Sequence, residues 1–217
     1  MTISEEYNTD GKPCIFVGKG PSAYFATEHE AFGDIATVND ASLLVSRVNW
    51  SFWVDMNKHM HGLQGAADRG AVFVLPDKMH SSSLPLSILG RLTGAIKLVD
   101  TAGLSVFPPE RTILYPYNLI GFQEADIIGA MEQEKVPLAS TSVGALYILA
   151  AHFQYRHIRC FGFDGGGAYV QKKEIIKSKN PFVDYTPFRR AMEIVASYAK
   201  KRYGTIIEFV REDGSFA

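Results

Sequence analysis

The feature of this sequence that most restricts its fold is the alternation of short apolar runs with stretches of helical periodicity. The apolar runs are continuous, which is typical of strands covered on both faces. Helical periodicity is found in residues 57–67, 122–134, 142–152 and 187–203. We expect strands over residues 14–17, 35–38, 51–55, 71–75, 95–99, 112–114, 137–139, 158–161 and 206–210.

Alternation of this kind favours an α/β protein. We predict a single-domain, Rossmann-like, doubly wound and mostly parallel sheet with helices on both faces. Two segments, residues 81–94 and 100–112, fit no element and indicate an insertion or an irregular crossover. In such folds ligands bind outside the carboxyl ends of the strands, so residues that follow a strand are the first candidates for function.

The composition excludes several classes of protein. The 217 residues suit one domain, residues 1–217, and the net charge of −1 provides no general attraction to nucleic acid or anionic membranes. The acidic, polar start lacks the features of a signal peptide, and no apolar run is long enough to span a bilayer. We therefore expect a cytoplasmic protein in which Cys14 and Cys160, both within predicted strands, are buried and reduced.

The segment VGKGPSA, between the first strand and a predicted helix, has the composition of an anion-binding turn. Gly18 and Gly20 let backbone N–H groups approach a negative group, and a helix N-terminus adds a favourable dipole. Pro21 fixes the first helical turn, and Ser22 is able to cap N–H groups or bind phosphate. Two alternatives remain: a turn that only joins two elements, or a dinucleotide site with Asp40 as its ribose-binding acid.

Further polar residues follow the other predicted strands. Asn39 ends the second strand, either as a ligand-binding residue or as a turn former. The segment STSVGA opens a helix, so its hydroxyls, those of Thr141 and Ser142 included, bind a ligand or serve only as the N-cap. In FGFDGGG, Gly162 and Asp164 follow a strand, and the carboxylate suits a sugar hydroxyl, a ribose, Mg²⁺ or a cap of the turn.

Residues 165–186 form a long polar connection with a lysine-rich stretch, and we predict a lid within the domain there. A solvated charged face is the alternative.

Three blocks of the sequence resemble the bacterial sialyltransferases of glycosyltransferase family 42. GKGPS is similar to the G-N-G-P-S turn of that family, and TVNDA is similar to its second strand with a terminal asparagine. STSVGALYILAAHFQYRHIRCFGFDGG resembles its TSG…GID stretch in order and spacing. The resemblance covers about half of the chain and extends to the related GxGPSL proteins, which include hydroxymethylpterin pyrophosphokinases.

The resemblance implies a nucleotide-sugar donor, possibly CMP-linked, and a carbohydrate or other hydroxyl acceptor, with no metal cofactor. It places the nucleotide among Gly18, Lys19, Gly20, Pro21, Ser22, Asn39, Thr141, Ser142, Gly162 and Asp164. Tyr169 and Tyr185 match the tyrosines that stabilise the leaving phosphate. The histidine base of the family has no counterpart, so Asp184 is the candidate base, and Lys19 replaces an asparagine.

Three other functions stay open. The first is a Mg²⁺-dependent pyrophosphokinase-like enzyme that holds its metal with Asp55 and Asp164 and uses the lysine-rich segment for phosphates. The second is a non-catalytic nucleotide-binding protein that has lost the base. The third is a dehydrogenase.

Overall fold

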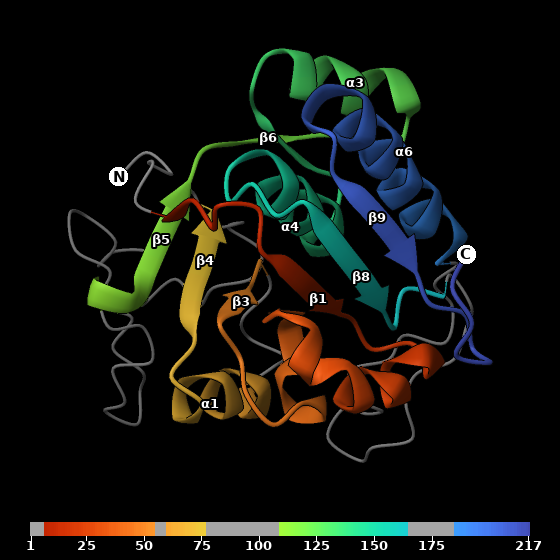
Figure 1. Cartoon of the computed structure of the whole chain (residues 1–217). Helices are drawn as coiled ribbons and strands as arrows, with labels where there is room; N and C mark the ends of the chain where they lie inside the picture. Colours follow the sequence, from red (N-terminus) through yellow and green to blue (C-terminus); the bar gives the residue numbers. More distant parts are fainter. Residues whose placement is uncertain (1–6, 55–59, 77–108, 165–184) are drawn as a thin grey trace.

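The computed structural model describes residues 7–54, 60–76, 109–164 and 185–217 (Figure 1). Its centre is a 7-stranded sheet of order β5-β4-β3-β2-β1-β8-β9, in which every neighbouring pair is parallel. The strands are β1 (Pro13–Val17), β2 (Asp34–Val38), β3 (Trp50–Phe52), β4 (Val72–Pro76), β5 (Thr112–Tyr115), β8 (His157–Phe161) and β9 (Ile206–Phe209). The predicted α/β class and parallel sheet are confirmed.

Helices cover both faces of this sheet, as expected for a doubly wound fold (Figure 1). The 3-10 helices η2 (Pro21–Phe32) and η3 (Asn39–Leu44) pack on one face together with α1 (Met60–Asp68). The helices α4 (Thr141–Ala151) and α6 (Thr186–Tyr203) pack on the other face, and α3 (Glu124–Glu132) packs against α6. A short 3-10 helix, η4 (Pro109–Arg111), precedes β5. No helix among the described residues is long and apolar enough to cross a membrane.

The side chains of β1 show how the two faces are filled. Ile15 and Val17 belong to the cluster under η2 and α1, whereas Cys14 and Phe16 belong to the cluster under α4 and α6. All four are fully buried, which explains the continuous apolar run in the sequence. Cys14 and Cys160 form no disulfide, and burial raises the pKa of both thiols, so they remain protonated and unreactive.

One predicted strand belongs elsewhere. The segment expected over residues 137–139 forms β7 (Val136–Leu138), which pairs not with the main sheet but with β6 (Tyr117–Leu119) in a separate two-stranded parallel sheet. β6 was not predicted, because Tyr-Asn-Leu is short, half-exposed and has no apolar run.

Other differences are local. The segment after the first turn is a 3-10 helix, although the sequence suggested an ordinary helix there. The predicted strand 95–99, the unassigned segment 81–94 and nearly all of the predicted lid lie outside the described residues, as does most of the unassigned segment 100–112.

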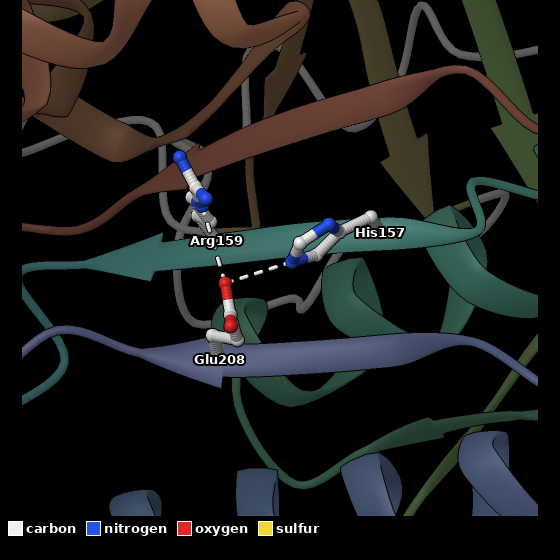
Figure 2. Close-up of polar contacts among 3 residues, drawn as sticks. All are labelled: His157, Arg159 and Glu208. Atoms are coloured by element: carbon white, nitrogen blue, oxygen red, sulfur yellow. Dashed lines mark hydrogen bonds and ion pairs between the residues drawn. The ribbon is translucent and has the colours of Figure 1, made fainter. Parts of the chain in front are cut away.

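A polar cluster joins the last two strands on the η2 side of the sheet (Figure 2). Glu208 on β9 accepts a hydrogen bond from Arg159 at 3.1 Å and lies 2.7 Å from the His157 ring nitrogen, both on β8. The Arg159 guanidinium also stacks on the Phe32 ring, 3.9 Å from its centroid. These contacts fix the edge strand β9 to the rest of the sheet.

Glu208→Gln should destabilise the protein at neutral pH by about 1 kcal/mol, the range for a partly exposed charge-assisted bond. Partial burial alone raises the pKa of Glu208, but the hydrogen bonds and charges of His157 and Arg159 outweigh it and lower the pKa. A carboxyl with a lowered folded-state pKa stabilises above its unfolded pKa, and this contribution is lost as the pH falls through the folded value. Urea unfolding should therefore show the difference at pH 7 and a smaller one below about pH 4; an equal difference at both would contradict this assignment.

Candidate functional site

The strand order places a topological switch point between β1 and β8. The chain proceeds from β1 toward β5 on one side, whereas β8 and β9 lie on the other side. Ligands of open α/β sheets bind at such a point, outside the carboxyl ends of the strands. Two segments with candidate site residues, the GKGPS turn after β1 and residues 161–164 (FGFD) at the end of β8, meet there.

The backbones of these two turns are hydrogen-bonded to each other. The Gly18 N–H donates to the Phe161 carbonyl at 2.7 Å, and the Gly20 N–H donates to the Gly162 carbonyl at 2.9 Å. A Cβ atom at Gly18 would lie 2.6 Å from the Gly162 oxygen. Gly162 itself has φ +75°, a conformation that favours glycine. The glycines are therefore needed for the close approach of the two turns.

Ser22 and Asp164 complete this junction. The fully buried Ser22 hydroxyl accepts a hydrogen bond from the Gly162 N–H at 2.7 Å, and the Ser22 N–H donates to Asp164 Oδ2 at 3.1 Å. The anion at the start of η2 is thus the protein's own carboxylate. The sequence does not indicate this contact between Ser22 and Asp164, because the two residues are 142 positions apart in the chain.

Two acceptor atoms near the junction have no hydrogen-bond partner within the part of the chain that the structure describes. They are Asn39 Oδ1 and Asp164 Oδ1, and both atoms are buried. Asn39 directly follows β2 and adopts a left-handed conformation with φ 51°. A buried acceptor without a donor is costly and requires an explanation, such as a ligand that supplies the donor.

A buried ion pair lies beside them. Lys19 Nζ lies 3.7 Å from Asp40 Oδ2, and the two side chains are 9% and 3% exposed. Burial lowers the pKa of Lys19, and the Asp40 carboxylate opposes this effect without cancelling it. Such a buried ammonium group interacts strongly with any negative group close to it, because its surroundings screen the charge less than water does. Asp40, weighed in the sequence as a ribose-binding acid, is instead the partner of Lys19.

The helix α4 begins at the same edge of the sheet. It runs from the end of β7 to the amino end of β8, so its N-terminus points toward the carboxyl ends of the strands. Ser140 is its N-cap and accepts a hydrogen bond from the Val143 N–H at 3.3 Å. The capping role therefore belongs to Ser140, while Thr141 and Ser142 are the first two helical residues, whose N–H groups have no intrahelical partner.

The predicted catalytic residues are only partly within the described chain. Tyr185 immediately precedes α6, and its ring centroid lies 5.6 Å from that of Phe188. Tyr169, Asp184 and Asp55 lie outside the described residues, so the proposed base and the alternative pair of metal ligands have no described geometry.

Sequence reasoning missed Arg189. It donates to the Phe163 carbonyl at 3.0 Å and so connects the first turn of α6 to the turn after β8. No motif marks this arginine, because its role follows only from the docking of α6 on the sheet.

Comparison with known proteins supports the fold. No family model and no curated protein sequence matches the chain. Among solved structures, the sialyltransferase CST-II in complex with a trisaccharide acceptor and CMP is similar, with 11% sequence identity over 91% of this chain and 80% of that chain and a TM-score of 0.50. A mutant of the alpha-2,3/8-sialyltransferase CstII gives 13% identity over 91% and 81%, with a TM-score of 0.51. The chain therefore has a sialyltransferase-like fold.

Gly20→Ala should destabilise the protein by about 2 kcal/mol, the usual cost of overpacking. The new Cβ would lie 2.4 Å from Asp164 Oδ2 and 2.9 Å from the Gly162 oxygen, so the two turns would have to separate. The matched control is Gly129→Ala within α3, where a Cβ meets nothing within 4 Å and alanine should stabilise the helix by about 0.5 kcal/mol. Equal thermal unfolding of the two variants would show that the junction does not depend on Gly20.

Proposed function

We propose that this protein is a glycosyltransferase-like enzyme that binds a nucleotide-linked sugar, of the CMP-linked class, and transfers the glycosyl group to a hydroxyl acceptor. The observation that supports it is a set of groups at the carboxyl edge of the sheet. Asn39 Oδ1 and Asp164 Oδ1 are buried acceptors that have no donor among the described residues, and the desolvated cation Lys19 lies beside them. A solved protein of the same fold holds CMP and a trisaccharide acceptor, which adds support.

The chemistry of these groups matches a nucleotide in two respects. Ribose hydroxyls and a base amino group are hydrogen-bond donors, which is what Asn39 Oδ1 and Asp164 Oδ1 require. A phosphate supplies negative charge for Lys19 and accepts hydrogen bonds from the first N–H groups of α4, those of Thr141 and Ser142. A dinucleotide site of the dehydrogenase type is less favoured, because its ribose-binding acid would be Asp40, which is paired with Lys19.

The proposed residues have two kinds of role. Four of them keep the two turns together and are positioning residues: Gly18, Gly20, Ser22 and Gly162. Pro21 begins η2 and fixes its first turn. In this proposal the ligand is contacted by the other five residues: Lys19, Asn39, Thr141, Ser142 and Asp164.

The reaction would be a single displacement at the anomeric carbon. Asp184 removes the proton from the acceptor hydroxyl, whose oxygen forms the new bond to that carbon, while the bond to the phosphate oxygen breaks and CMP leaves with the electron pair. The hydroxyl groups of Tyr169 and Tyr185 donate hydrogen bonds to the departing phosphate. Tyr185 is suited to this task because α6 leads into the amino end of β9, so that its N-terminus lies at the carboxyl edge of the sheet. The proposal includes no metal ion.

CMP should stabilise the protein without Mg²⁺. At a hundred times its Kd a ligand adds about 2.7 kcal/mol, which for a domain of this size raises Tm by about 5–10 °C. Asn39→Ala and Ser142→Ala should reduce this shift. The first variant removes the Asn39 Oδ1 acceptor, and the second removes the Ser142 hydroxyl, which the proposal places beside the phosphate at the start of α4. Ser197→Ala, on the exposed face of α6, is the matched control and should retain it.

The same thermal-shift measurement distinguishes the alternatives. Stabilisation by ATP only when Mg²⁺ is present would replace the proposal with the pyrophosphokinase-like function, and stabilisation by NAD would support a dehydrogenase. Unchanged CMP affinity in both Asn39→Ala and Ser142→Ala would exclude these residues from the site.

Asp184→Asn should retain CMP binding, but its rate of glycosyl transfer should fall by about a hundredfold or more, because a general base contributes that much to the rate. The measurement is release of CMP from a CMP-linked sugar in the presence of an oligosaccharide acceptor. Wild-type protein that binds CMP but transfers nothing under any condition would indicate the non-catalytic alternative, and full activity of Asp184→Asn would exclude Asp184 as the base.

A further inference from the structure

Residues of α3 and α6 line a surface groove. These two helices lie on the opposite side of the main sheet from η2 and α1 (Figure 1). The volume of the groove is about 800 Å³. The half-buried side chains of Ile128, Ile194 and Tyr198 provide an apolar portion of its lining. The proposed nucleotide site lies at the carboxyl edge of the sheet and shares none of these residues.

The two helices that border this groove carry opposite charge. α3 has three acidic residues and no basic one, whereas α6 has five basic residues and a single acidic one, Glu193. Glu124 and Glu132 line the groove from α3. Arg190, Lys201 and Arg202 line it from α6. The groove is therefore an acidic stripe beside a basic stripe with apolar side chains among them.

The charged side chains that line the groove from the two helices form no ion pairs with each other or with other described residues, apart from Glu193. Glu193 pairs with Arg189 at 2.7 Å, but none of the five groove charges from Glu124, Glu132, Arg190, Lys201 and Arg202 forms an ion pair among the described residues. All five side chains are exposed. The charges are thus available to a partner that carries both signs.

We propose that this groove is a homodimer interface in which α3 of one copy packs against α6 of the other. In a two-fold symmetric interface the same surface is used by both copies, so each pair of facing stripes occurs twice. The acidic stripe of α3 would meet the basic stripe of the second α6, and the basic stripe would meet the second α3. A uniformly acidic or basic partner would match only half of the surface, which is why a second copy fits best.

Charge reversal provides the test. The double variant Glu124→Lys/Glu132→Lys makes both stripes basic, and Arg190→Glu/Lys201→Glu gives the α6 residues of the groove a net negative charge although Arg202 remains. Each should weaken self-association by about a hundredfold, because the facing stripes become repulsive. An equimolar mixture of the two should form a 1:1 heterodimer, because the facing stripes again carry opposite net charge. Light scattering after size-exclusion chromatography measures the molar mass of each species. The wild-type protein should have twice the mass of one chain.

The control for Glu124→Lys/Glu132→Lys is Glu28→Lys/Glu110→Lys, which makes the same change in net charge on exposed residues of η2 and η4. It should dimerise as the wild type does, and dimerisation of both should weaken with added salt. The proposal is wrong if the wild type is a monomer throughout, if the two groove variants dimerise normally, or if their mixture forms no heterodimer. Circular dichroism confirms that each variant is folded, and the mixing result distinguishes lost pairing from lost structure. None of these outcomes depends on the proposed transferase activity.

Discussion

The hydrogen-bonded junction between the turns after β1 and β8 is the constraint on which the rest of the candidate site depends. Two backbone bonds join the turns, and Ser22 and Asp164 add two more through their side chains. Side chains at Gly18 or Gly20 would separate the turns. β1 and β8 flank the switch point, so the two joined turns form the protein surface that a ligand at the carboxyl edge would contact.

The junction also explains the unusual electrostatics around it. Because Asp164 uses Oδ2 to accept the Ser22 N–H, its Oδ1 remains buried and without a partner among the described residues. Lys19, between the two glycines of the first turn, is held within a largely desolvated position and faces Asp40. Burial thus produces acceptors that need donors and a cation whose pKa is lowered. A nucleotide is a ligand that supplies both donors and negative charge.

The two proposed surfaces of the molecule belong to different layers. The proposed nucleotide site is formed by turns at the edge of the sheet, where backbone geometry and burial decide its chemistry. The groove between α3 and α6 is formed by exposed side chains on an outer layer. Charges that form no ion pair among the described residues and half-buried apolar groups decide its chemistry. The Glu208 cluster on the opposite face has a third role, since it holds the edge strand in place.

The sequence by itself determined the α/β class, most strands of the sheet and the polar residues after them, because continuous apolar runs and glycine-rich turns are local signals. It also indicated which turns lie at the carboxyl edge of the sheet. Only the tertiary structure decided that β7 pairs with β6, that Asp40 pairs with Lys19, and that the Asp164 carboxylate accepts the Ser22 N–H at the start of η2. Each of these depends on contacts between segments distant in the chain, and no local pattern of residues specifies such a contact.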